Sequence, residues 1–568
     1  MLTPYVITIF GSTGWAQLFL GLVLLCLTTN ALKKDASDGS AATKNAAAVP
    51  KDFPTFQRQY LAVMGIVMLA DWLQGPYIYD LYMESLSEAQ YSSLFLSGFL
   101  SSAVFGTPVG VLVDTIGRKR GCVLYCVLEI VINLLEHATT FELLLLGRFL
   151  GGISTSLLGC AFESWMVSRH KAKGYPAHLL DETFTIVSVA NGVLAVIGGV
   201  IGYVLVKPLG MGPIGPFRAA VALSAVAMLL VSSWEENYGE AEPASEAAPV
   251  ATNRSKSAAD DPDGGVLGTF VGGLRSMLSS MSAAAGAMAA DPRLWMLGLV
   301  QAFFEGSMFG WVSQWVPALF HLKEEKEELP VGIIFSCLML CISTGANLFA
   351  AAQSRGASVR MLMTLTLALS FSSMVLPFLV PYPPSFSLVL AAFCGFEAAC
   401  GAFMPGMGVL RAEIIPARMQ STIMTAYRLP LNAVVVLVTQ LGKTGVASSV
   451  TGVWKGWEAA CAASAIFFAL ALALHLLGSS RGPPEEGKGD ERPPKPRAAA
   501  TAKPRAPSTK KRTSTPSSVS ARPKASPART ARSPAPKASP APGAPQGSGM
   551  RPASKRVRTP SRKVAKAD

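Results

Sequence analysis

Several ionisable residues stand inside stretches of sequence that are otherwise almost entirely apolar. Asp71 follows the run LAVMGIVMLA, and Arg148 lies within LLLGRFLGG. An ionised side chain is costly in a lipid bilayer unless it faces water or an opposite charge. Charges on several apolar segments therefore predict a polar cavity among those segments. Further charges of this kind are Glu163, Glu305, Glu397 and Arg428, and Glu129 is an additional candidate.

The sequence next to two of these charges bears on what they do. Arg428 is followed by Leu429 and Pro430, and a proline inside a helix leaves a backbone carbonyl without its usual partner. Such freed carbonyls are tolerated in membrane helices where other polar groups lie close by. Arg148 fits either a wet cavity or a structural ion pair with a carboxylate, and the sequence leaves both interpretations open.

The chain around these charges has the composition of a membrane protein. It has 568 residues, of which 50% are hydrophobic and 15% are charged, whereas a soluble protein is about a quarter charged. The formal net charge of +13 comes from the segment 481–568, which holds 22 Lys and Arg against 5 Asp and Glu and leaves −4 for the rest. The nine cysteines contain no CxxC pair, so we expect no metal site and no cofactor. The sequence offers no combination of a nucleophile with a general base that would indicate an enzyme.

Thirteen apolar segments are long enough to cross a bilayer as helices, which predicts an all-α polytopic membrane protein. The first runs from about Tyr5 to Thr28. It lacks the basic start and small-residue cleavage site of a signal peptide, so we expect it to be retained. The twelve others are expected at about 57–82, 92–113, 121–138, 142–168, 184–207, 216–234, 293–320, 331–354, 359–381, 384–410, 420–442 and 456–477.

Basic residues predict the orientation of these segments. Lys and Arg concentrate in alternate loops, whereas the other loops are sparse in charge or acidic, as in HLKEEKEELP at 321–330. Because cytoplasmic loops carry the excess of Lys and Arg, we place the basic side in the cytoplasm and the N-terminus outside. The expected parts are an extra N-terminal transmembrane helix (1–31), a cytoplasmic linker (32–56), a six-helix bundle (57–234), a partly disordered cytoplasmic central loop (235–292), a second six-helix bundle (293–478) and a disordered basic cytoplasmic tail (479–568).

The segment GVLVDTIGRKR, residues 110–120, resembles the signature of the major facilitator superfamily and lies in the expected loop. That resemblance implies two six-helix halves related by an axis along the membrane normal. The motif is expected to take part in gating. Gly110 allows close helix contact, Asp114 can pair across the helix ends, and Gly117 permits a tight turn. The gating candidates are Gly110, Asp114, Gly117, Arg118 and Lys119.

Further motifs narrow the resemblance to one branch of that superfamily. They are ADWLQGPYIYDLY (70–82), GRFLGGISTSLL (147–158), AFESW (161–165), GMGPIGPF (210–217), WEENY (234–238), GIIFS (332–336), ACGAFMPGMGVLR (399–411) and YRLP (427–430). Together they resemble the molybdate-anion transporter family over about residues 55–440. The resemblance implies secondary uptake of molybdate by alternating access, with the two halves rocking around a site at the membrane midplane.

The implied substrate suggests roles for the intramembrane charges. Molybdate is a tetrahedral dianion, and such a ligand needs charge-assisted donors in a low-dielectric pocket. Arg148 and Arg428 are the expected donors, one in each half. Hydroxyl and amide groups expected to complete the site are Ser154, Asn191, Tyr427 and Asn432. The carboxylates expected to balance the arginines or to carry a coupling proton are Asp71, Glu163, Glu305 and Glu397.

Alternatives stay open at this point. The solute is molybdate, another oxyanion such as sulfate, or an organic anion; a non-transporting receptor or scaffold is a different class, which the cost of the intramembrane charges disfavours. The tail is too poor in hydrophobic residues to fold, so it is a solvated extension or adsorbs to anionic lipid headgroups, and we expect no nucleic-acid partner. We expect a monomer in the plasma membrane.

Overall fold

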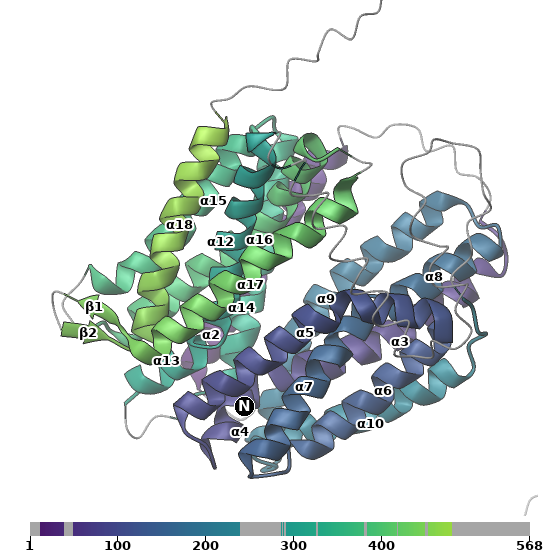
Figure 1. Cartoon of the computed structure of the whole chain (residues 1–568), viewed down its shortest axis with the longest axis horizontal. Helices are drawn as coiled ribbons and strands as arrows, with labels where there is room; N and C mark the ends of the chain where they lie inside the picture. Colours follow the sequence, from purple (N-terminus) through teal and green to yellow (C-terminus); the bar gives the residue numbers. More distant parts are fainter. Residues whose placement is uncertain are drawn as a thin grey trace, which may run out of the picture. The chain divides into compact units, whose positions relative to one another are not determined.

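The computed structural model describes residues 12–38, 49–238, 286, 288, 291–324, 328–379, 383–416, 419–448 and 452–479. These residues fold almost entirely into helices (Figure 1). The predicted tail and most of the predicted central loop lie outside the described residues. Within the described part, the one sheet is a short antiparallel hairpin of β1 (Val446–Ser448) and β2 (Gly452–Trp454).

The helices that precede the central loop in the sequence pack together as a first group. α3 contacts α9 and α10, α5 contacts α7, and α6 contacts α7 and α10. Its aromatic core includes Trp165 stacked on Trp234 with ring centroids 3.8 Å apart. The elements are α3 (Phe53–Gln74), η1 (Gly75–Tyr77), α4 (Ile78–Met83), α5 (Glu88–Ile116), α6 (Arg118–Leu135), α7 (Phe141–Leu158), α8 (Ala161–Ala172), α9 (Ala177–Val206) and α10 (Gly215–Ser232).

A second group follows the central loop and has its own core. α14 contacts α16, α12 contacts α17 and α18, and α15 contacts α16 and α18. Phe304 stacks on Phe403 at the centre of this group, with ring centroids 3.6 Å apart. The elements are α12 (Pro292–Val312), α13 (Trp315–Leu322), α14 (Val331–Ser354), α15 (Val359–Val375), η2 (Leu376–Phe378), α16 (Phe386–Ile414), α17 (Gln420–Thr444) and α18 (Trp457–Ser479).

Each of the thirteen apolar segments forms one long helix or two consecutive helices. In the described part, nine spans are long and apolar enough to cross a membrane, or ten if α5, bent by 52° next to Pro108, counts as one. α6, α12 and α17 are the remaining three, and the charged residues within them include Glu129, Glu305 and Arg428. Three expected continuous helices are interrupted in the described part. Residues 142–168 form α7 and α8, with a turn at Gly159 and Cys160 between them. Residues 293–320 form α12 and α13, with a turn at Ser313 and Gln314, and the segment at 57–82 contains η1 between α3 and α4.

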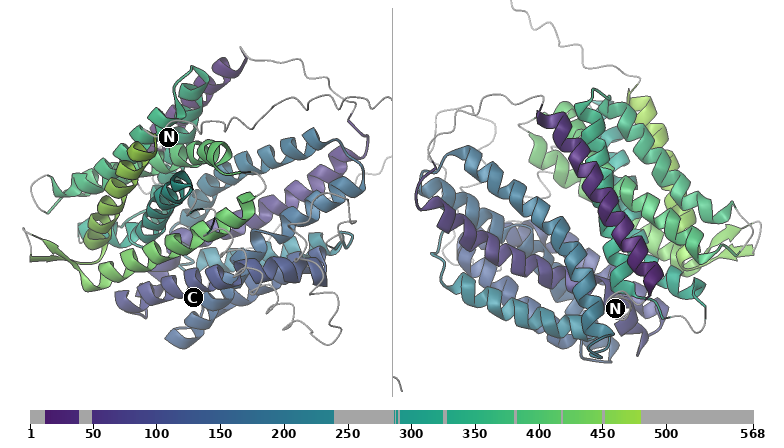
Figure 2. Two further views of the ribbon diagram at one scale, coloured as in Figure 1. Left: turned by 45° about the horizontal axis from the view of Figure 1, so that its top comes forward. Right: turned by 180° about the vertical axis from the view of Figure 1, so that it is seen from behind.

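The extra N-terminal helix, α2 (Thr13–Asp38), continues beyond its expected end at Thr28 and packs against α14 (Figure 2). Trp15 meets Phe386 edge-on, and Arg355 donates to the carbonyl of Leu32 at 3.3 Å. Leucines on the other face of α2 are exposed, as expected for a surface in contact with lipid. The helix that comes first in the sequence is therefore attached to the second group of helices.

The two groups meet along α9 with α14 and along α5 with α17. Their polar contacts lie at the end that carries the acidic loop: Gly332 donates its backbone N–H to the Tyr77 hydroxyl at 3.1 Å, and Tyr91 donates to the carbonyl of Ser313 at 3.1 Å. Lys207 forms an ion pair with Glu328 at 2.8 Å. This hydrogen bond lowers the pKa of Glu328, so the pair stays charged at neutral pH.

Backbones also approach closely at this end. A Cβ atom on Gly332 would lie 2.2 Å from the carbonyl oxygen of Gly199, so only glycine allows α9 and α14 to cross at this distance. Ser336 secures the same crossing by donating to the carbonyl of Val196 at 2.7 Å. Glycine packing and side-chain hydrogen bonds thus close this end of the molecule.

Candidate functional site

Arg428 lies in α17 at the boundary between the two groups of helices. Its Nη1 atom would be 3.3 Å from a Cβ on Gly106 of α5, and the Ser156 hydroxyl of α7 lies 4.0 Å from the same point. The side chain is exposed, and no carboxylate of the described residues forms an ion pair with it. A guanidinium in this position has its donors available for a ligand, because it stands in a membrane-spanning helix without a direct counter-charge.

Glu305 of α12 is a carboxylate within electrostatic range of this arginine. The carboxylate is hydrogen-bonded to Gln301 and lies within electrostatic range of both Arg411 and Arg428. Arg411, in the last turn of α16, makes no ion pair with the described residues either. The second group of helices therefore contains two cations around one carboxylate, an arrangement with one positive charge in excess.

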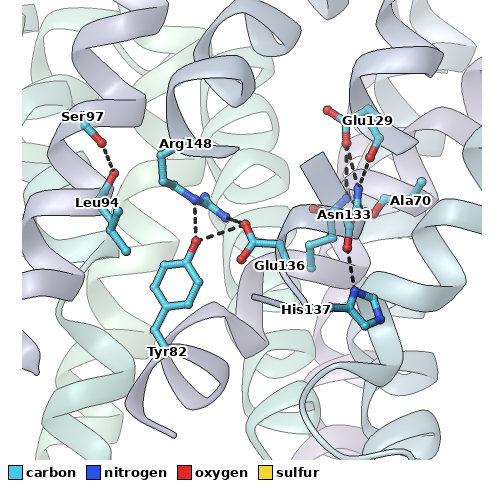
Figure 3. Close-up of polar contacts among 10 residues, drawn as sticks. Ala70, Tyr82, Leu94, Ser97, Glu129, Asn133, Glu136, His137 and Arg148 are labelled. Carbon is cyan, nitrogen blue, oxygen red and sulfur yellow. Dashed lines mark hydrogen bonds and ion pairs between the residues drawn. The ribbon is translucent and has the colours of Figure 1, made fainter. Parts of the chain in front are cut away.

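Arg148 has a different environment. Its Nη2 atom donates to Glu136 at 2.5 Å, and its Nε atom donates to the Tyr82 hydroxyl at 2.8 Å (Figure 3). The Glu136 side chain is only 1% exposed. Of the two interpretations that the sequence left open, the structure shows the ion pair. Glu136 was missed because it stands at the end of an expected segment, where a carboxylate is usually in solvent.

A second polar cluster surrounds Glu129 on α6. Ser154 donates to this carboxylate at 2.6 Å, Asn133 at 3.3 Å and Gln74 at 3.5 Å. Asp71, one turn before Gln74 on α3, lies within electrostatic range of Glu129. Ser154, expected as a substrate ligand, thus has a carboxylate as its partner in this structure.

The other expected ligands are dispersed. Asn191 accepts a hydrogen bond from the Trp72 indole at 2.8 Å. Tyr427 is buried and donates to the carbonyl of Leu294 at 2.5 Å, which directs its hydroxyl toward α12. Asn432 is half-buried on α17. The structure therefore does not gather these three side chains around one arginine.

Two of the carboxylates that were expected to balance Arg148 and Arg428 are located elsewhere. Glu397 is buried in α16 and its carboxylate is hydrogen-bonded to Cys400. Glu163 is exposed on α8, where it lines a cavity of about 480 Å³ together with Arg118 and Lys171. The cluster around Arg428 instead contains residues that were not expected: Gly106, Ser156, Gln301 and Arg411.

The GRKR turn is held by the WEENY segment. Gly117 has a φ of +110°, and the helix that follows begins with the N–H groups of Lys119 and Arg120, which donate to the Glu236 carboxylate at 2.8 and 3.2 Å. An anion is stabilised at a helix N-terminus. Asp114 accepts from Arg118 at 2.8 Å within the same turn. WEENY thus joins the end of α10 to the start of α6.

Substituting either of two glycines in this motif by alanine is expected to have opposite effects on stability. A Cβ on Gly117 would lie 2.6 Å from Glu236 Cδ and would adopt a left-handed conformation, so Gly117→Ala is expected to destabilise the protein by about 1–3 kcal/mol. A Cβ on the helical Gly110 would meet no atom within 4 Å, so Gly110→Ala is expected to stabilise by about 0.5–1 kcal/mol. Thermal unfolding of the purified protein in detergent measures both. Equal unfolding temperatures would contradict these roles of the two glycines.

The fold and its polar interior define the class of protein. A solved auto-inhibited peptide transporter of the POT family aligns with a TM-score of 0.56 and 13% identity over 75% of this chain and 97% of its own. A solved point mutant of the nucleoside transporter NupG aligns with a TM-score of 0.52 and 13% identity over 75% and 98%. At this identity the likeness shows the fold alone, and that fold is the major facilitator fold. Its long apolar helices make the chain a multi-pass membrane protein, as predicted.

Sequence relatives define the family within this class. A molybdate-anion transporter of Takifugu rubripes is 32% identical over 73% of this chain and 84% of its own length. A molybdate-anion transporter of Danio rerio is 32% identical with the same coverage. A family model described as sugar transporters with 12 transmembrane segments matches residues 17–274 and 271–396. The chain belongs to the molybdate-anion transporter family of the major facilitator superfamily.

Proposed function

We propose that this protein takes up molybdate as a secondary transporter and binds the oxyanion at Arg428. The observation that carries the proposal is the Arg428 guanidinium, which has no ion pair among the described residues and stands beside Gly106 and Ser156 of the other group of helices. Its curated relatives are named molybdate-anion transporters. A residue that contacts both groups of helices senses any change in their separation, as alternating access requires.

The charges around Arg428 suit a dianion. With the site empty, Glu305 balances one of the two positive charges of Arg411 and Arg428. An arriving oxyanion accepts hydrogen bonds from both guanidinium groups, because charge-assisted bonds from arginine to oxyanions are strong and often bidentate. Glu305 is then the counter-charge of the two arginines in the empty site, and the substrate takes over that role when it binds.

The contacts between the two groups support an assignment of the conformation. Tyr77, Tyr91 and Lys207 bridge the groups at the end with the acidic loop. The positive-inside rule assigns that end to the outside. A state closed to the outside is consistent with these contacts. The proposal includes basic loops and a tail in the cytoplasm, an N-terminus outside, and a monomer in the plasma membrane.

Uptake in cells that lack their own carrier tests the substrate. Cells that express this chain are expected to accumulate molybdate saturably, with a tenfold excess of sulfate reducing the rate by less than about twofold. Uptake that sulfate abolishes would reassign the chain to a general divalent oxyanion carrier. Uptake equal to that of untransfected cells, in cells where surface labelling detects the protein, would refute the proposal.

A further inference from the structure

Helix α17 carries Arg428 and packs closely against α12 (Figure 1). One face of α12 has a small residue at every fourth position, namely Gly298, Ala302, Gly306 and Gly310. A Cβ atom on Gly306 would lie 2.6 Å from the Cβ of Val434, and one on Gly310 would lie 2.4 Å from Cγ1 of Val438. Side chains of α17 therefore fill the places that these glycines leave open, which fixes the rotation of α17 about its own axis.

Tyr427 makes the same kind of contact directly beside Arg428. Its ring lies against Gly298, where a Cβ atom would be 2.4 Å from Cε1 and 2.5 Å from Cδ1 of the tyrosine. Its hydroxyl donates to the carbonyl of Leu294 at 2.5 Å, and the side chain is only 1% exposed. A buried tyrosine hydroxyl usually has such a partner. The ring and the hydroxyl together attach this turn of α17 to α12 at two points.

The turn that contains Tyr427 and Arg428 depends on this attachment. Pro430 lies inside α17, and a proline leaves the carbonyl four residues earlier, here that of Ala426, without its helical hydrogen bond. The backbone from 426 to 430 is therefore held less firmly by the helix itself. Contacts with α12 then determine how this turn is oriented.

The orientation of that turn sets the direction of Arg428. Successive residues of an α-helix point about 100° apart around its axis, so Arg428 does not share the groove in which Tyr427 lies. Its Nη1 atom instead reaches the first group of helices, 3.3 Å from the place of a Cβ on Gly106. Because the guanidinium stands at the end of a long side chain, a small rotation of the turn displaces it far more than it displaces the backbone.

We propose that Tyr427 is a positioning residue of the anion site: packed on Gly298 and bonded to Leu294, it directs Arg428 across the boundary toward the first group of helices. Tyr427 acts through Arg428 and does not itself contact the substrate. The effect on uptake rests on the proposed function, whereas the placement of Arg428 does not depend on what the site binds.

Two alanine substitutions on α12 test this role, because they introduce the same clash at different distances from Arg428. Gly298→Ala displaces the Tyr427 ring, and Gly310→Ala presses on Val438 with an equal contact of 2.4 Å, roughly 16 Å further along α17. Both variants are expected to unfold at a lower temperature than the wild type in detergent. A role in packing alone would therefore affect the two variants alike.

Uptake by liposomes that contain the purified full-length chain separates positioning from packing. Gly298→Ala is expected to raise the half-saturating molybdate concentration about tenfold, the factor for one lost charge-assisted hydrogen bond, and to keep the maximal rate within about twofold. Gly310→Ala is expected to keep the half-saturating concentration of the wild type. An unchanged value in Gly298→Ala, or an equal rise in both variants, would overturn the proposal.

Tyr427→Phe isolates the hydroxyl group. The variant keeps the ring against Gly298 and loses the bond to Leu294, so the half-saturating concentration is expected to rise about threefold, as for one neutral hydrogen bond. In an Arg428→Lys background the same substitution is expected to have no further effect, since lysine lacks the planar fork that needs orienting. The same rise in both backgrounds would show that Tyr427 does not act through Arg428.

Modification of Arg428 by phenylglyoxal, a reagent for guanidinium groups, tests the placement without any substrate. Peptide mass spectrometry of the purified protein is expected to show faster modification of Arg428 in Gly298→Ala than in the wild type, because the guanidinium leaves its contact with α5. Gly310→Ala is expected to match the wild type.

Equal modification rates of Arg428 in all three proteins would overturn the positioning role. If Gly298→Ala does not elute as monodisperse protein, Tyr427→Phe takes its place in both measurements, with the same direction of change expected. If the wild type transports no molybdate, the proposed function fails, and the modification rates still decide whether Tyr427 directs Arg428.

Discussion

Replacing Arg428 by alanine is expected to reduce molybdate uptake to near background at concentrations that half-saturate the wild type, while leaving the fold intact. The guanidinium is exposed and unpaired among the described residues, so its removal breaks no ion pair, and Glu305 keeps Arg411 as a neighbour. Loss of two charge-assisted hydrogen bonds at about 1.5 kcal/mol each reduces affinity by about 100-fold. Initial uptake rates over a range of molybdate concentrations measure the loss.

Two control variants make this result interpretable. Arg428→Lys keeps the charge but has no planar fork, so it is expected to retain uptake at a raised half-saturating concentration. Arg360→Ala removes a partly exposed arginine that pairs with Glu413 at 2.7 Å in the same group of helices. Exposed ion pairs of this kind contribute little to stability, so this variant is expected to transport as the wild type does. Full uptake by Arg428→Ala would remove the proposed anion site.

Arg148→Met is expected to destabilise the protein rather than to remove a substrate ligand. It leaves the Glu136 carboxylate, 1% exposed, without its counter-charge, and breaking a buried ion pair in this way costs about 3–5 kcal/mol. The Tyr82 hydroxyl loses the same partner. The unfolding temperature in detergent is therefore expected to fall, whereas Arg428→Ala should unfold as wild type does.

The double variant Arg148→Met/Glu136→Leu distinguishes the two roles. Removal of both charges eliminates the unpaired carboxylate, so most of the lost stability is expected to return, because apolar replacements of buried pairs are often neutral. Uptake is expected to return with it. A double variant that unfolds as wild type but transports nothing would show that Arg148 binds the substrate.

Most of the membrane helices were predictable from the sequence because long apolar segments cross a bilayer as helices. The expected segments at 331–354 and 456–477 match α14 and α18 to within a few residues. The break at Gly159 and Cys160 was not predictable, since the residues on either side of it, LLGCAF at 157–162, are apolar and contain no proline. Where an unwound turn falls depends on the helices that pack around it.

The charges were predictable as a set but not as pairs. The cost of burying a charge identified Arg148 and Arg428 as unusual residues. It did not indicate that Arg148 is paired whereas Arg428 has no ion pair among the described residues. The difference arises from Glu136, which the short connection between α6 and α7 brings back to Arg148. In the same way, Gln74 became informative only when the packing of α3 placed it beside Glu129. Asn133 lies one turn after Glu129 on α6, so helical periodicity alone places it there.

The most direct test of the proposed anion site is molybdate uptake by liposomes that contain the purified full-length chain and no other protein, with Arg428→Ala reconstituted in parallel. We predict saturable uptake by the wild type, without ATP, and uptake at the level of empty liposomes for the variant. Equal uptake by both proteins would contradict the assignment of the site. No uptake by wild-type protein that elutes as a monodisperse species would contradict the proposed function itself.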